Sequence, residues 1–159
     1  MEALSRLLPV PLSEKEARLK NPLALAFIGD TVWDLLTRQR LLLSGAQVNA
    51  LHKKAVSTVN AAAQARCAGR LLPYLTDEES AVLRRGENAH SHHPAPKNQT
   101  PVDYSHATGL EALMGYLYLT GQHERLNTLF DLSQDPTLQK EMISNAGEDA
   151  PCGTGTPHL

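Results

Sequence analysis

The stretch NPLALAFIGDTVWDLLTR, residues Asn21–Arg38, decides the fold. An asparagine followed by a proline is a typical helix start, with Asn21 as the N-cap and Pro22 at the first helical position. The apolar residues that follow lack the sustained period-two alternation that indicates a half-buried strand. The pattern therefore predicts one long helix from Pro22 to Leu43, ended by Gly45.

The rest of the chain has the same helical character, and we predict an all-α protein. Leucine and alanine dominate, while capping boxes and glycine stops divide the sequence into segments. We expect a short helix from Ser13, then helices over 50–68 (ended by Gly69), 76–88, 104–119 and 122–132, and a short helix restarting at Asp135. Residues 90–103 contain three prolines and many polar residues, which predicts an exposed loop.

Length and composition indicate one ordinary globular domain of 159 residues. We expect an N-terminal segment (1–20), the main helical domain (21–133), a short C-terminal helix (134–146) and a disordered Gly/Pro-rich tail (147–159). The N-terminus has no long apolar core of a signal peptide, and the longest apolar runs fall far below the roughly 18 residues of a membrane span. Two scattered cysteines make no disulfide framework, so we expect a cytoplasmic protein.

The net charge of −2 argues against a general nucleic-acid binder, which is usually strongly basic. The charges are unevenly distributed, however. Residues 51–100 carry seven basic and four acidic side chains, a net charge of +3, whereas residues 101–159 carry two and eight, a net charge of −6. The middle third can therefore present a basic surface, and the overall charge does not exclude a polyanionic substrate.

Two acidic residues stand alone in apolar helices, each near a glycine. Asp30 follows Gly29 directly, and Glu111 is the only charge in residues 107–119, with Gly115 one turn later. A salt bridge or a position at the edge of the core would explain either acid alone. If Gly115 lets the two helices approach closely, the two carboxylates instead form one site for a hard divalent cation such as Mg²⁺, as in metal-assisted phosphodiester hydrolysis.

The segments LALAFIGDTVWDLL (23–36) and ATGLEALMGYLYL (107–119) resemble the two acidic helices of the ribonuclease III family. The match is closer to Mini-ribonuclease III, a catalytic domain without an appended double-stranded RNA-binding domain. Segments 51–65, 81–89 and 96–113 share the resemblance, which extends over about 21–130.

The chain departs from full-length ribonuclease III at three acidic positions. Leu23 and Ala26 stand where the family usually has glutamates, and Thr108 stands where it has an aspartate. Mini-ribonuclease III is similar to this sequence in that reduction. Only Asp30 and Glu111 therefore carry over as catalytic, metal-binding residues.

The resemblance implies a dimeric ribonuclease III-type helical domain with Mg²⁺-dependent endonuclease activity on double-stranded RNA, in which Mn²⁺ can substitute. It implies products with 5′-phosphate and 3′-hydroxyl ends. It also points to the precursor of large-subunit (23S) ribosomal RNA as substrate, with a ribosomal protein that assists substrate presentation as a further partner. Phe27 and Trp33 are candidates for the dimer interface, with a core role equally open. The alternative is a non-catalytic module of the same fold that binds structured RNA or ribosomal particles.

Basic residues in the middle third are candidates for RNA contacts, because phosphate contacts supply much of nucleic-acid affinity. The candidates are Lys53, Lys54, Arg84, Arg85 and Lys97, for which an ordinary solvated face is the alternative. Glu87 stands where a relative is expected to have a basic residue. His90, His92 and His93 cluster in the proline-rich loop, but no second Cys or His pair at useful spacing completes a metal site.

Overall fold

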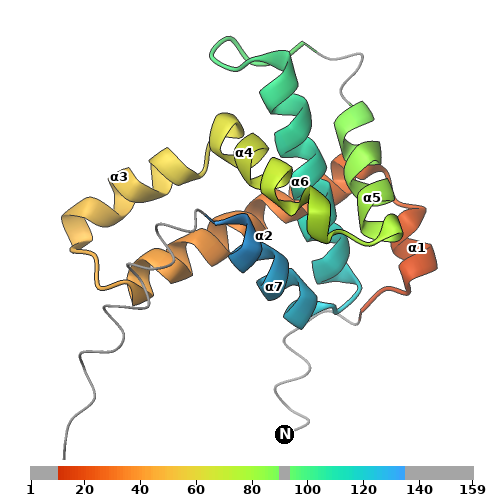
Figure 1. The fold of residues 1–159 in the computed structure, drawn as a ribbon, viewed down its shortest axis with the longest axis horizontal. Coiled ribbons are helices and arrows are strands. Elements are labelled where there is room, and N and C mark those ends of the chain that lie inside the picture. Colours follow the sequence, from red (N-terminus) through yellow and green to blue (C-terminus); the bar gives the residue numbers. More distant parts are fainter. Residues whose placement is uncertain (1–10, 90–93, 135–159) are drawn as a thin grey trace, which may run out of the picture.

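The computed structural model describes residues 11–89 and 94–134, and these ranges contain helices but no strand (Figure 1). The elements are α1 (Glu14–Arg18), α2 (Pro22–Leu43), α3 (Val48–Thr58), α4 (Ala61–Leu71), a 3₁₀ turn η1 (Leu72–Tyr74), α5 (Asp77–Asn88), α6 (Pro101–Leu119) and α7 (His123–Ser133). The all-α prediction is confirmed. No helix within these ranges is long and apolar enough to cross a membrane.

Helix α6 is the centre of the fold. Ten of its residues are buried, including every residue from Ala107 to Leu117 except Glu111. Helix α2 crosses α6, while α4 and α5 lie on either side of it (Figure 1). A helix that is apolar on nearly all sides must be surrounded by others, which is why the segment with the least charge occupies the middle.

Glycines bring α2 and α6 into backbone contact. A Cβ atom added at Gly29 would collide with the carbonyl oxygen of Glu111, and one added at Gly115 would collide with the carbonyl oxygen of Leu25. Each glycine therefore accommodates the backbone of the opposite helix, as predicted for Gly115 from its missing side chain.

The expected caps are present. The Asn21 side chain accepts a 2.9 Å hydrogen bond from the amide of Leu23, and Pro22 occupies the first turn of α2. Thr76 and Glu79 form a complete capping box at the start of α5. At the other end of α2, Gly45 has a φ of +73°, a left-handed conformation that favours glycine.

Several helix boundaries differ from the predicted ones. The single helix predicted over 50–68 is wrong, because the chain breaks between α3 and α4 at Val59 and Asn60. The Asn60 side chain accepts a 2.9 Å hydrogen bond from the amide of Ala63 and so starts a new helix, which runs through Gly69 to Leu71. Helix α6 likewise begins earlier than predicted, at Pro101, because Thr100 caps it.

Several predictions fall outside the described residues: the histidine cluster at 90–93, the short helix restarting at Asp135, and the tail over 147–159. Of the two roles left open for Trp33, interface or core, the structure shows the core role. Its side chain is 0% exposed and packs edge-on against Phe130 with ring centroids 4.8 Å apart, so it belongs to the core of one chain. Phe27, on another face of α2, is 81% exposed.

Candidate active site

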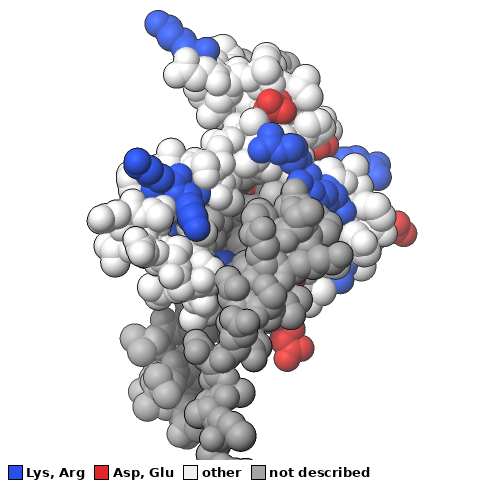
Figure 2. Space-filling model, turned by 60° about the vertical axis from the view of Figure 1, so that its left-hand side comes forward, with Lys and Arg blue, Asp and Glu red and all other residues white. Residues whose placement is uncertain are grey.

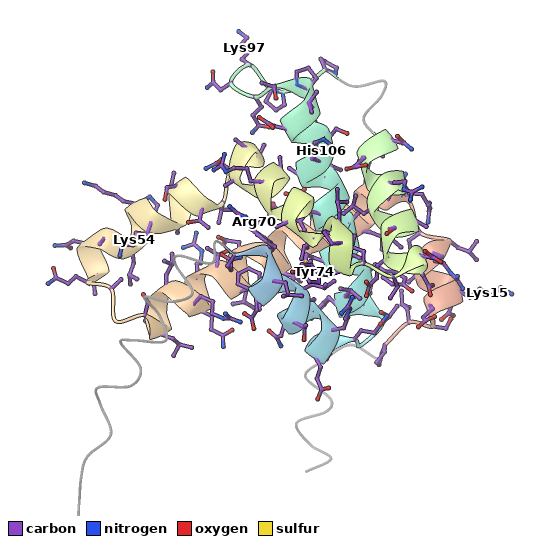
Figure 3. The ribbon with its side chains drawn as sticks, in the orientation of Figure 1. Lys15, Lys54, Arg70, Tyr74, Lys97 and His106 are labelled. Carbon is purple, nitrogen blue, oxygen red and sulfur yellow. The ribbon has the colours of Figure 1, made fainter. Side chains whose placement is uncertain are left out.

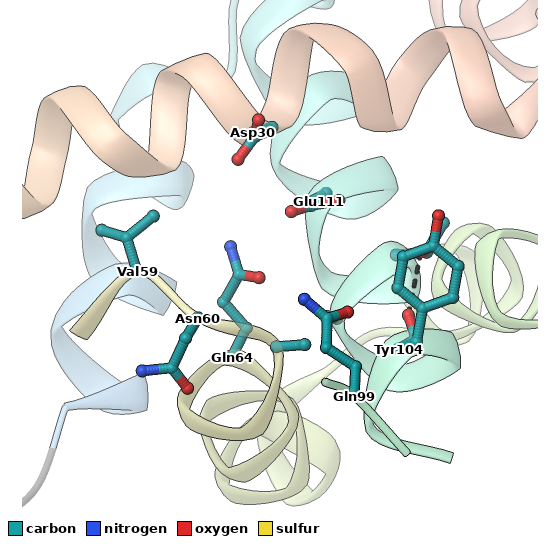
Figure 4. A pocket seen from close by; sticks show the side chains of 10 residues that line it. Asp30, Val59, Asn60, Gln64, Gln99, Tyr104 and Glu111 are labelled. Atoms are coloured by element: carbon teal, nitrogen blue, oxygen red, sulfur yellow. Dashed lines mark hydrogen bonds between the residues drawn. The ribbon is translucent and has the colours of Figure 1, made fainter. Parts of the chain in front are cut away.

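The crossing of α2 and α6 brings Asp30 and Glu111 together. Gly29 contacts the backbone of Glu111 itself, so the residue that follows Gly29 faces the same point of α6. Both carboxylates border one pocket, and Figure 4 shows their side chains next to each other at its upper edge. The other residues that line the pocket come from the α3–α4 junction, α4, the loop before α6, and α6: Val59, Asn60, Ala61, Gln64, Gln99, Tyr104, Ala107 and Thr108.

The two carboxylates have different environments. Asp30 is exposed, whereas Glu111 is half-buried. Burial, the negative charge of Asp30 and a hydrogen bond to Asp30 together raise the pKa of Glu111 to about 8, although the amide of Gln64 opposes the shift. An acid held beside another acid in a partly buried pocket lacks a compensating positive charge.

This donor set fits a divalent cation. Two carboxylates from two helices border an open pocket, and Mg²⁺ commonly takes one or two carboxylates and keeps several waters. In the described part of the chain, no third His, Cys, Asp or Glu joins a metal-binding group. Asp30 and Glu111 are therefore the side chains that would hold the ion, and substrate phosphate and water would supply further oxygens.

Comparison with known proteins agrees with this geometry. Residues 23–122 match the Ribonuclease III domain. The Mini-ribonuclease 3 of Symbiobacterium thermophilum is 47% identical over 115 residues, 72% of this chain and 88% of the relative, and that of Streptococcus pneumoniae is 43% identical over 72% and 91%. The chain belongs to the Mini-ribonuclease 3 family. A Fusobacterium nucleatum protein of known crystal structure has the same fold, with 30% identity, a TM-score of 0.66, and coverage of 72% of this chain and 93% of that one.

Family membership confirms the assignment as an endoribonuclease of the ribonuclease III type. The match covers both acidic helices and everything between them, so the pocket lies wholly within the matched region.

Asp34 lies one turn after Asp30 on α2. It pairs with Arg38 at 2.8 Å on the same helix, as expected for an ordinary surface acid.

The predicted RNA-binding residues lie in different places. Lys53 and Lys54 are exposed on α3, and Lys97 is exposed in the loop before α6. In Figure 3, Lys54 and Lys97 project outward with α4 between them. The face in Figure 2 shows Lys and Arg atoms at several places and fewer Asp and Glu atoms.

Two residues of α5 have structural partners. The Arg85 guanidinium donates to the carbonyl oxygens of Arg18 and Lys20, at 2.5 and 3.1 Å, and so ties α5 to the turn between α1 and α2. Glu87 pairs with Nδ1 of His106 at 2.6 Å. Its negative charge is thus directed to α6, while Arg84 on the same helix is exposed.

The sequence analysis overlooked Gln64, which lines the pocket beneath the two acids. A weak signal was present: Gln64 is the only polar residue in Ala61–Ala65, one turn after the cap Asn60. A lone glutamine among alanines on a helix is usually a surface residue, however, so only the packing of α4 against α6 reveals its position.

Proposed function

We propose that this chain is a Mg²⁺-dependent endoribonuclease that cuts double-stranded RNA. The observation that carries the proposal is the carboxylate pair, Asp30 and Glu111, at the α2–α6 crossing. An isolated like-charge pair destabilises a fold unless something between the charges compensates it, and a divalent cation does so. Mn²⁺ is expected to substitute, because its oxygen-ligand preferences are similar.

The residues have distinct tasks in this reaction. Exposed Asp30 meets the substrate side of the pocket, and half-buried Glu111 fixes the inner side, so together they orient whatever binds between them. A bound divalent cation supplies an activated water and stabilises charge on the departing oxygen. Water adds to phosphorus and the bond from phosphorus to the 3′ oxygen breaks, which leaves 5′-phosphate and 3′-hydroxyl ends.

Duplex RNA is the substrate class that the surroundings favour. Lys53 and Lys54 are exposed on α3, whose C-cap Val59 lines the pocket, and Lys97 is exposed in the loop that supplies Gln99 to it. The pocket has one aromatic residue, Tyr104, rather than a stacking platform. Proteins recognise duplex RNA through shape, phosphates and 2′-hydroxyls. Arg84 is exposed and is assigned to the same role, as is Arg85, although its guanidinium also holds two backbone carbonyls.

A homodimer would place two such sites on one duplex. Phe27 and Leu35 on α2 are large, apolar and exposed, at 81% and 64%. A second copy seated on this face would bury them. Doubling the phosphate contacts on a rigid duplex would also raise the avidity of a chain whose net charge is only −2.

The biological substrate that we propose is the precursor of 23S ribosomal RNA in the cytoplasm, cut near its paired ends. A ribosomal protein that presents the RNA is a compatible partner. Several relatives at 43–47% identity are named Mini-ribonuclease 3, which supports the activity class.

The test is cleavage of a long RNA duplex with and without Mg²⁺, by the parent and by Asp30→Asn and Glu111→Gln. We expect metal-dependent cutting that both substitutions abolish while folding and duplex binding persist. A folded parent that binds duplex RNA but cuts neither generic duplex nor pre-ribosomal RNA would instead identify a non-catalytic RNA-binding module.

A further inference from the structure

Gln64 carries a buried hydrogen-bond donor without a partner. The residue is only 4% exposed, and its Nε2 atom makes no hydrogen bond to any described residue. Buried amides are nearly always paired, because an unpaired donor destabilises the fold. An exception inside a candidate active site therefore points to a hydrogen bond that is completed in the working state.

The position of the amide limits what that group can be. Gln64 extends from α4 toward the two carboxylates (Figure 4). Its Nε2 atom has almost no solvent-accessible surface, so an RNA phosphate entering the pocket cannot reach it directly. The acceptor that it faces is the carboxylate of Glu111, the inner member of the pair.

We propose that Gln64 is a positioning residue that donates from Nε2 to the Glu111 carboxylate and orients it as a metal ligand. The inference rests on the proposed function, since it concerns how the two-carboxylate site is held. With only two acids at the site, little else fixes the direction of the Glu111 oxygens. Carboxylates that ligate metals are typically held by hydrogen bonds from an outer layer of residues, and losing such a bond costs 10- to 100-fold in metal affinity or activity.

The packing explains why the donor comes from α4. Residues Ala61, Ala63 and Ala68 are buried small side chains, which let α4 approach α6 closely. Gln64 alone among Ala61–Ala65 is long enough to reach across. Asn60 fixes the start of α4 one turn earlier, and so fixes the direction in which Gln64 points.

The experiment is calorimetric titration of the folded, RNA-free protein with Mn²⁺ as the probe. Gln64→Met removes the N–H donors and keeps the length of the side chain. We expect Mn²⁺ affinity about ten-fold weaker than in the parent. The unfolding temperature without metal should be unchanged or higher, because the substitution removes an unpaired buried donor; a merely structural glutamine would lower it.

A second variant, a control variant and Mn²⁺ binding by the parent complete the test. Gln64→Leu serves if the methionine variant fails to fold, and Gln122→Met, at the N-cap of α7 and outside the pocket, is the matched control with unchanged Mn²⁺ affinity. Unaltered affinity in Gln64→Met overturns the role of Gln64 while leaving the proposed metal site intact. If the parent does not bind Mn²⁺, or if Asp30→Asn binds it equally well, the proposed metal site is overturned, and this inference with it.

Discussion

Buried Glu79 and half-buried Glu111 have opposite environments. Glu79 on α5 is 5% exposed, yet its carboxylate accepts hydrogen bonds from Arg125 at 2.8 and 2.9 Å and from the backbone amide of Thr76 at 2.9 Å. Burial alone would raise the pKa of Glu79, but the contacts with Arg125 and Thr76 outweigh it and the net pKa is lowered. The net effect of its surroundings is to favour the charged form of this side chain in the folded protein.

Glu111 has the contrary arrangement. Its nearest ionisable neighbour is Asp30, and burial together with that like charge raises its pKa to about 8. The same residue type thus stabilises the fold in one helix and strains it in another. A carboxylate whose negative charge is not compensated within the fold is a good candidate for binding a positively charged ligand.

The largest expected effect comes from separating α2 and α6, whose close crossing holds the carboxylates of Asp30 and Glu111 together. In Gly29→Ala, the new methyl group would meet the Glu111 carbonyl, push α2 away from α6 and separate the carboxylates. We expect a loss of about 3 kcal/mol in unfolding free energy and loss of cleavage. Urea unfolding measures the first quantity.

Gly69→Ala is the matched control for that substitution. Gly69 lies within α4, and a Cβ atom added there meets nothing within 4 Å. Alanine should therefore raise stability by about 0.5–1 kcal/mol, because it is the better helix former. Equal stability of Gly29→Ala and the parent would show that the close crossing is not what holds the site together.

Local chemistry explains what the sequence could predict of this arrangement. The caps at Asn21 and Thr76 depend on residues within one turn, so they were predictable. The meeting of Asp30 with Glu111 was also within reach, because Gly115 indicates a close helix contact. Each of these features is encoded by a few neighbouring residues.

The remaining features either have a weak local signal or depend on distant parts of the chain. A hydrogen bond of 2.9 Å at Asn60 divides one predicted helix into two, and a single asparagine does not outweigh the helical pattern around it. The sequence does not assign Trp33 to the core or to an interface, because α2 is apolar on several faces. Its packing against Phe130 of α7 assigns it to the core. The carboxylate of Glu111 that Gln64 faces, and the carbonyl oxygens that Arg85 binds, likewise lie in distant parts of the chain.

The next effect is a gain of stability from removing the strained charge. Glu111→Gln should raise the unfolding free energy of the metal-free protein by about 2 kcal/mol at pH 8. The folded-state pKa of Glu111, about 8, lies above the ordinary value of 4.5, so the folded protein holds a proton that the unfolded chain releases. The parent therefore loses stability as pH rises from about 4.5 to 8.

Urea unfolding in EDTA at pH 5 and pH 8 measures this difference. The gain from Glu111→Gln should be small at pH 5 and largest at pH 8. A substitution that destabilises the protein equally at both pH values would mean that the Glu111 carboxylate is compensated within the fold, like that of Glu79.

The corresponding substitution at Glu79 tests the glutamate that stabilises the fold. Glu79→Gln keeps a side chain that can complete the capping box but removes the charge that faces Arg125, so we expect a loss of about 1–2 kcal/mol at pH 7. The folded-state pKa of Glu79 is lowered, so the stabilisation is present above the unfolded value near 4.5 and disappears as pH falls through the folded-state pKa.

Thermal unfolding across pH 3–7 follows this change. Glu124→Gln, an exposed substitution in the first turn of α7, is the control and should cost about 0.5 kcal/mol or less. If Glu79→Gln behaves like Glu124→Gln, the contact with Arg125 adds nothing measurable and the contrast between Glu79 and Glu111 rests on Glu111 alone.

The smallest expected effect compares how the two glutamates respond to metal. A divalent cation at ten times its dissociation constant stabilises the folded state by about 1.4 kcal/mol. Mn²⁺ should therefore raise the unfolding temperature of the parent and of Glu79→Gln by similar amounts, because Glu79 lies outside the pocket. Asp30→Asn and Glu111→Gln should show no such rise, since each removes one of the two carboxylates. A rise that survives in Glu111→Gln would place the bound ion elsewhere, and the strain at Glu111 would then have no compensating ligand.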